Sequence, residues 1–216
     1  HYAPFITVNP SIAAQQALVS QSTYFVNFAG VPYVPANVSA VLDDREQNAT
    51  AQQIDGIDLT AQDTWPLLGG ELDALASGTW LRIQQRTVPA APEVELTGTV
   101  FNPPRFKSRA SVTWRRGAWS TTAAFNYVGR ETDNTGTVAI PVSSWSTVDA
   151  QLSYAVPSSV PRVLRGFRAS LSVQNLFDRA PPHLAVGSTT YPGLSYDSTN
   201  ASALGRFVSA DLTKSW

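Results

Sequence analysis

The chain has 216 residues, of which 15 are basic and 16 acidic, and its formal net charge is −1 at pH 7. This balance argues against a nucleic-acid-binding protein, which would carry a basic stripe. Cysteine is absent, which excludes disulfides, thiolate catalysis and sulfur-ligated metals. Only 14% of the residues are charged, against about 25% in soluble domains. That composition fits both a β-barrel between lipid and water and a secreted β-sandwich.

Two further absences narrow the class of protein. No run of 18 apolar residues occurs, so a transmembrane helix is excluded. Methionine is absent and the sequence starts at His1. We therefore expect a processed product, an engineered segment or a fragment.

Residues 1–51 have a mixed character. Pro10-Ser11 followed by apolar residues predicts a short helix, and the stretch from Pro35 to Leu42 predicts another, with Asn37 as a possible N-cap. We expect an extracellular-loop-like segment with short helices here, followed by a strand-rich domain over 52–216.

The second part of the chain predicts strands separated by turns. Most of them lie near the 9–11 residues that a tilted strand needs to cross a bilayer. Alternation is clearest in the last strand, where Val208, Ala210 and Leu212 share one face. The seven candidate strands cover residues 52–65, 78–87, 105–115, 118–130, 144–156, 166–177 and 205–216.

The connections between these strands alternate in length. Residues 115–117 form a tight turn and 157–165 a short one, whereas longer loops lie near 88–104, 131–143 and 178–204. Short turns at one end and long loops at the other are typical of transmembrane barrels, whereas a sandwich more often has short loops at both ends. The fold class we predict is all-β, an antiparallel transmembrane β-barrel.

The number of strands indicates an incomplete barrel. Seven is odd, whereas bacterial single-chain barrels use even numbers. Open edges in lipid would leave backbone groups unpaired. Either an eighth strand, supplied by the first ten residues, closes a small barrel, or these strands complete a larger one.

Aromatic side chains are expected at two membrane levels because their rings favour the lipid–water boundary. The alternative is that aromatics simply fit pleated surfaces. We expect Trp114, Trp119, Phe207 and Trp216 to be girdle residues. The turn lengths place Trp65, Trp80, Trp114, Trp119, Tyr154, Phe167 and Trp216 at one level, and Tyr127, Trp145, Phe177 and Phe207 near the other.

Basic side chains alternate with apolar ones in two of the strands. In a barrel they would line the lumen, and in a sandwich they would form a solvated face. The residues concerned are Arg82 and Arg86 in one strand and Arg105, Lys107 and Arg109 in the next.

The sequence contains no catalytic constellation, and we expect no enzyme activity, no cofactor and no metal site. The two histidines, His1 and His183, have no metal-ligand spacing, and no G-x-S-x-G motif occurs. Asp43-Asp44-Arg45-Glu46 is either a solvated loop or a cation contact. In the last long loop His183, Tyr191 and Tyr196 are candidate ligand contacts by position.

Several segments resemble TonB-dependent outer-membrane receptors over most of 50–216. The resemblance is carried by the combination of these motifs in this order. They are Ile54-Asp55-Gly56-Ile57-Asp58-Leu59, Asn102-Pro103-Pro104-Arg105, Asn126-Tyr127-Val128-Gly129, Ser172-Val173-Gln174-Asn175-Leu176-Phe177-Asp178 with Pro181-Pro182, and Tyr196-Asp197-Ser198-Thr199-Asn200 leading to Gly205-Arg206-Phe207-Val208 and Trp216.

The resemblance implies a 22-stranded barrel closed by an N-terminal plug, of which these seven or eight strands would be about a third. Such receptors take up iron chelates (siderophores), cobalamin or oligosaccharides across the bacterial outer membrane. The implied partners are outer-membrane lipid, the plug and remaining barrel strands, the TonB system acting through the plug, and the assembly machinery that reads the terminal strand ending at Trp216. The basic residues above would face the lumen or the plug. The alternatives are a small passive porin or structural barrel, and a secreted β-sandwich binding module.

Overall fold

The computed structural model describes most of the chain, which divides into two compact units. The first unit comprises residues 1–52 and 85–94, and the second comprises 53–84 and 95–216. No helix in the described part of the chain is long and apolar enough to cross a membrane. The described residues are 6–43, 51–87, 92–157, 159–184 and 195–215.

The first unit contains one α-helix, α1 (Ile12–Ser20). Ser11 caps it, because its Oγ accepts a hydrogen bond of 3.1 Å from the Ala14 amide, which satisfies one of the orphan donors of the first turn. The side chain of Gln15 is buried and donates to the carbonyl oxygens of Pro10 and Pro35 at 3.0 and 2.9 Å. The predicted helix after Pro10 is confirmed.

The second predicted helix in this unit is wrong. A single 3₁₀ turn, η2 (Pro35–Asn37), is followed by β2 (Ala40–Leu42). Asn37 lies inside the turn, and the capping position belongs to Val34. Strand β2 pairs antiparallel with β1 (Ile6–Val8), because the β-branched residues of both segments favour an extended backbone.

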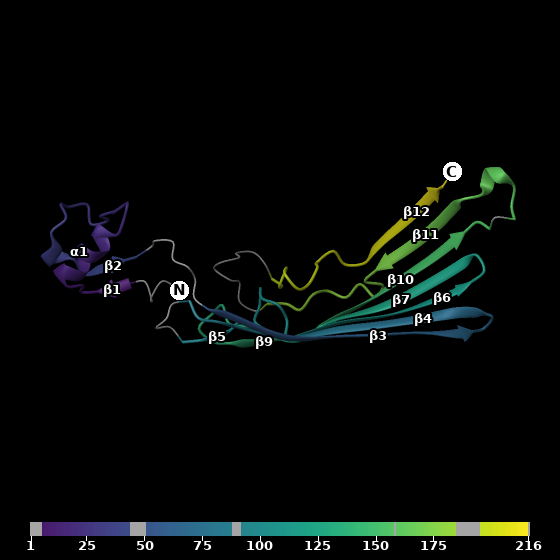
Figure 1. The fold of residues 1–216 in the computed structure, drawn as a ribbon, viewed down its shortest axis with the longest axis horizontal. Helices are drawn as coiled ribbons and strands as arrows, with labels where there is room; N and C mark the ends of the chain where they lie inside the picture. Colours follow the sequence, from purple (N-terminus) through teal and green to yellow (C-terminus); the bar gives the residue numbers. More distant parts are fainter. Residues whose placement is uncertain (1–5, 44–50, 88–91, 158, 185–194, 216) are drawn as a thin grey trace. The chain divides into compact units, whose positions relative to one another are not determined.

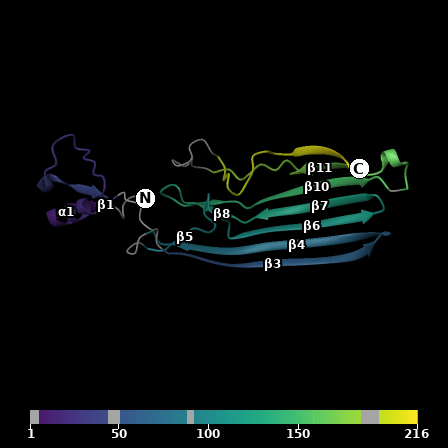
Figure 2. The same ribbon diagram turned by 45° about the horizontal axis from the view of Figure 1, so that its top comes forward.

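The second unit is an antiparallel sheet in which strands adjacent in the chain are adjacent in space. The order is β12-β11-β10-β7-β6-β4-β3, and Figures 1 and 2 show the strands side by side in that order. Within the described residues β3 and β12 are not paired with each other, so the sheet is open. The strands are β3 (Gln52–Leu67), β4 (Gly70–Gln85), β6 (Phe106–Arg116), β7 (Trp119–Val128), β10 (Trp145–Ala155), β11 (Phe167–Gln174) and β12 (Phe207–Lys214).

Four short elements lie between these strands in the chain. Strand β5 (Val94–Glu95) pairs with β4, and β8 (Glu131–Asp133) pairs with β9 (Ile140–Val142). A 3₁₀ turn, η3 (Arg162–Leu164), lies between β10 and β11. The predicted all-β, antiparallel class and the seven main strands are therefore confirmed.

Strand β4 is longer than predicted. It begins at Gly70 rather than near residue 78, because Leu68 and Gly69 both have positive φ, 51° and 70°, and turn the chain tightly after β3. A side chain at Gly70 would collide with the carbonyl oxygen of Arg115 on β6. Small residues between Ala74 and Gly78 weaken the alternation that would have revealed this part of the strand.

The register gives the sheet one apolar and one polar face. Leu152 pairs with Leu171, and Leu171 with Ala210, and the side chains of Leu171 and Leu212 are 48% and 71% exposed. The intervening residues Gln151 and Ser172 pair with each other on the other face. An exposed apolar face of this extent is unusual in water, and it is typical of a barrel wall against lipid.

Aromatic rings on the apolar face gather near the short turns. Trp119 and Tyr154 have ring centroids 4.7 Å apart, and the Trp114 Nε1 donates to the Leu67 carbonyl oxygen at 3.0 Å. Trp80 does not belong to this group, since it pairs with Phe106 near the opposite end of β6. The earlier start of β4 moves Trp80 to the level near the long loops.

The second aromatic level also differs from the prediction. Phe106 and Tyr127, with centroids 6.0 Å apart, lie on the apolar face there. Phe207 pairs with Gln174 and Trp145 with Val128, which places both on the polar face by strand alternation. Trp216 lies outside the described residues.

Candidate functional site

Polar side chains from three neighbouring strands form a network on the polar face of the sheet. Arg109 on β6 donates to Asn126 on β7, and its Nη1 lies 3.3 Å from the Asp149 Oδ2 on β10. The Asn126 side chain donates to the same carboxylate oxygen at 2.8 Å, and the backbone amide of Asn175 donates to the other Asp149 carboxylate oxygen at 3.0 Å. The network therefore ties β6, β7 and β10 to the residue that follows β11.

A second group of charges lies on the same face near the short turns. Arg115 on β6 forms an ion pair with Asp73 on β4, and its Nη1 lies 3.6 Å from the Glu71 Oε1. Thr64 on β3 donates to Asp73 at 2.7 Å. The acidic groups on this part of the polar face thus have their cationic partner within the sheet itself.

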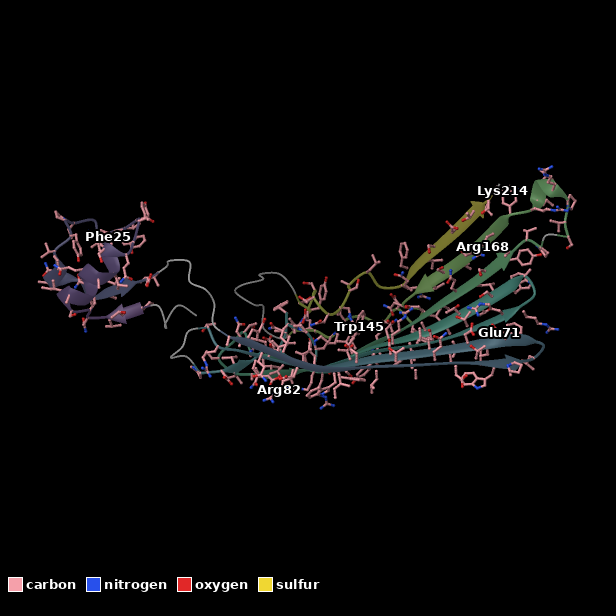
Figure 3. The ribbon with its side chains drawn as sticks, in the orientation of Figure 1. Phe25, Glu71, Arg82, Trp145, Arg168 and Lys214 are labelled. Carbon is pink, nitrogen blue, oxygen red and sulfur yellow. The ribbon has the colours of Figure 1, made fainter. Side chains whose placement is uncertain are left out.

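The five predicted lumen-facing basic residues do not share one face. Lys107 and Arg109 lie on the polar face. Arg82 has the same parity as Trp80 on β4 and lies on the opposite side (Figure 3), where its Nε is 3.4 Å from Glu95. The prediction that Arg82 faces the lumen is therefore wrong. The residues of that segment on the polar face are Leu81 and Ile83.

The remaining two basic residues have acidic partners close by in the chain. Arg105 lies just before β6, with its Nη2 3.1 Å from the Glu95 Oε1. Arg86 pairs with Glu93 at 2.5 Å within the first unit. Both arginines therefore have an acidic partner among the described residues.

At the long-loop end of the sheet, Asp197 and Asn200 form the centre of a buried polar cluster. Asp197 is only 4% exposed, and its carboxylate accepts from the amides of Phe101 and Thr199 at 2.8 and 2.7 Å. The Asn200 Nδ2 reaches the Asp197 carboxylate at 2.9 Å and the Glu131 Oε1 at 2.7 Å.

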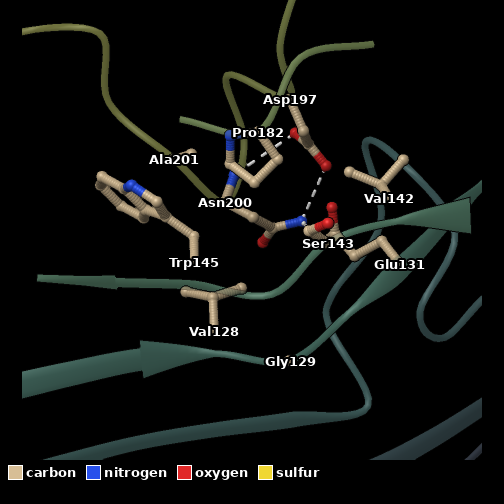
Figure 4. A pocket seen from close by; sticks show the side chains of 10 residues that line it. All are labelled: Val128, Gly129, Glu131, Val142, Ser143, Trp145, Pro182, Asp197, Asn200 and Ala201. Atoms are coloured by element: carbon tan, nitrogen blue, oxygen red, sulfur yellow. Dashed lines mark hydrogen bonds between the residues drawn. The ribbon is translucent and has the colours of Figure 1, made fainter. Parts of the chain in front are cut away.

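The same Asn200 amide donates to the backbone carbonyl oxygen of Asn102 at 2.7 Å. One side chain of the β11–β12 connection therefore holds the segments that follow β5 and β7. We call Glu131, Asp197 and Asn200 the loop-end cluster (Figure 4).

Two carboxyl groups meet in this cluster. The pKa of Glu131 is raised to about 8, chiefly by burial and then by the charge of Asp197 and a hydrogen bond with it, whereas the bond from Asn200 lowers it. Such a group is protonated at neutral pH and can donate to its neighbour. The cavity beside the cluster has about 10 Å³, close to the space for one water molecule, so the cluster fits a structural tie better than a ligand pocket.

A small apolar core supports the cluster. Val100, Val142 and Leu184 are buried together, with Phe101 packed against them. The Leu184 amide donates to the Ser195 carbonyl oxygen at 2.8 Å, which joins two parts of the β11–β12 connection.

The predicted ligand-contact residues lie in different surroundings. His183 is exposed and lines a hollow of about 210 Å³ together with Trp145 and Arg179. Arg179 donates to the Ser146 hydroxyl at 2.7 Å. Tyr196 is half-buried, and Tyr191 lies outside the described residues.

Asp197 and Asn200 lie within one of the family-like motifs of the sequence, which by itself indicates no role for them. An aspartate followed by Thr199 and Asn200 is a signal for a side-chain-capped turn, and that signal could have identified them. Glu131 had no such local signal, because its neighbours in the cluster are far away in the sequence. Among the described residues no group of three His, Asp or Glu could hold a metal ion.

The comparison with protein families identifies the family of the chain. Residues 14–176 match the family described as TonB dependent receptor-like, beta-barrel. Neither the search of curated proteins nor that of solved structures found a match. The family match covers well over half of the chain and agrees with an open antiparallel sheet that has one apolar face. The chain therefore belongs to the TonB-dependent receptor-like β-barrel family of outer-membrane proteins.

Proposed function

We propose that the chain forms part of the wall and loops of an active transporter that takes up a scarce ligand, of the siderophore, cobalamin or oligosaccharide class. The observation that carries the proposal is the open, two-faced antiparallel sheet in a chain of the TonB-dependent receptor barrel family. The apolar face would contact outer-membrane lipid and the polar face the lumen. The family consists of transporters rather than enzymes.

The open sheet supports a larger barrel. Strands β3 and β12 each have one unpaired edge within the described residues, and unpaired edges are not viable in lipid. We infer that further strands of the same protein pair with both edges and that an N-terminal plug fills the lumen. The TonB system would then act through that plug.

The segment over 1–51 precedes β3, and its chain enters the sheet at the end that carries the long loops. We propose that it is an extracellular segment, together with the loops that carry His183, Tyr191 and Tyr196. The exposed His183 beside Trp145 and Arg179 supports a ligand contact there.

Of the basic residues on the polar face, we assign contact with the plug to Lys107 rather than Arg109. Arg109 already pairs with Asp149, whereas the Lys107 ammonium has no partner among the described residues. A basic side chain without a partner in the wall can pair with an acidic group of a plug at modest desolvation cost.

Uptake measurements test the proposal. In cells that express the intact protein, uptake of its ligand should stop when the TonB system is deleted or the proton gradient is collapsed. Lys107→Glu should reduce uptake without lowering the amount of protein in the outer membrane. Uptake that continues without TonB, together with a steady ion conductance in planar bilayers, would identify a passive porin instead.

A further inference from the structure

The loop-end cluster brings two carboxyl groups to the same Asn200 side-chain amide, at 2.7 and 2.9 Å, at a junction of three segments. Glu131 follows β7, Asp197 lies between β11 and β12, and the third segment, Phe101 to Asn102, lies between β5 and β6. Glu131 and Asp197 are 7% and 4% exposed. Two buried carboxylates cannot both ionise without strong repulsion, so one of them retains its proton.

We propose that Glu131 retains a proton beside the Asp197 carboxylate and that the two side chains form a pH-sensitive latch, which holds these three segments together. With the proton present, Glu131 donates to the Asp197 carboxylate, and the Asn200 amide bridges the two groups. Loss of the proton to solvent leaves two negative charges beside one Asn200 amide. The latch then loosens, and Asp197 releases the amides of Phe101 and Thr199.

Glu131 and Asp197 have no other charged side chain beside them in the lining of the adjacent cavity. The other residues lining the adjacent cavity, among them Val128, Val142, Trp145 and Pro182, carry no charge. The nearest further acid on the same strand is Asp133, which is buried and whose Oδ1 accepts from Thr135. Within the described residues no cation pairs with Glu131, so nothing there compensates the charge of an ionised carboxylate.

The direction of the pH effect follows from the raised pKa of Glu131. In an opened loop the pKa of the Glu131 carboxyl has its ordinary value of 4.5, and in the closed cluster this pKa is about 8. The latch is therefore most stable below about pH 4.5. Between these two values the equilibrium constant for opening should rise about tenfold per pH unit and level off above pH 8, because opening releases one proton.

Hydrogen exchange of the intact protein in detergent micelles tests the latch. The variant Glu131→Gln keeps an acceptor for Asn200 and a donor for Asp197 but cannot ionise. The ratio of wild-type to variant exchange rates for the amides of Phe101 and Thr199 cancels the intrinsic pH dependence. We expect this ratio to rise about tenfold per pH unit and then level off.

The matched control is Glu71→Gln, an exposed acid near the short turns (Figure 3), which should leave the wild-type pH profile in place. A wild-type to Glu131→Gln ratio that does not change with pH overturns the proposal. If Glu131→Gln fails to fold, infrared spectra of the wild type with labelled glutamate decide instead. A protonated carboxyl band that persists at about pH 7 supports the latch, and its absence overturns it.

Discussion

An arginine in place of Leu171 is expected to reduce insertion into the outer membrane sharply. Leu171 lies at the centre of β11 between Leu152 and Ala210 on the apolar face, where its side chain is 48% exposed. A charged side chain at the bilayer midplane of a barrel costs about 2–4 kcal/mol. The free energy of unfolding in lipid bilayers and the amount of protein in outer-membrane fractions measure this effect.

The neighbouring substitution Ser172→Arg is the matched control. Ser172 pairs with Gln151 and Ser209 on the polar face, so an arginine there would extend into water and should change the unfolding free energy by less than about 1 kcal/mol. If both arginines were tolerated equally, or if only Ser172→Arg were destabilising, the apolar face would not contact lipid.

The second large effect is expected for Asp197→Ala. This change removes the side-chain acceptor of the backbone amides of Phe101, Thr199 and Asn200. Each buried donor left without an acceptor costs about 1–3 kcal/mol, so the free energy of opening the loop-end cluster should fall by about 4 kcal/mol. Hydrogen exchange at the Phe101 and Thr199 amides measures it, while the exchange of β10 amides should not change.

Ser198→Ala changes an exposed residue of the same turn and serves as the control for Asp197→Ala. Its exchange rates should match those of the wild type. Equal exchange rates in Asp197→Ala and Ser198→Ala would show that the cluster does not hold the loops.

The strands could be predicted from the sequence because alternation of apolar and polar residues follows the pleat directly. In β12, Val208, Ala210 and Leu212 lie on one face as the pattern indicates. The prediction failed for the first part of β4, where small residues between Ala74 and Gly78 carry little hydrophobic signal.

The same limitation explains why Arg82 was expected to face the lumen and why Phe207 was expected in the aromatic girdle. Near strand ends the apolar alternation fades, and an aromatic or basic residue there fits either phase. Only the register, with Trp80 opposite Phe106 and Gln174 opposite Phe207, decides which face each side chain occupies.

The loop-end cluster could not be predicted from local pattern. Glu131 and Asn200 are separated by 69 residues, and no periodicity connects them. Strand β10 separates β7 from β11 in the sheet, so their contact depends on the course of the long connections and not on strand pairing. The buried Gln15 in the first unit is a similar case, since it joins α1 to Pro35 across 20 residues.

The central claim is that β12 and its neighbours span the outer membrane with one face toward lipid and one toward water. Because the chain contains no cysteine, single cysteines at successive positions from Val208 to Thr213 can carry a nitroxide label in the intact protein, reconstituted in lipid. We predict a period of two, with labels at 208, 210 and 212 accessible to oxygen dissolved in lipid. Labels at 209, 211 and 213 should be accessible to a water-soluble relaxation agent. Equal accessibility of both sets to the water-soluble agent would contradict a membrane-spanning sheet.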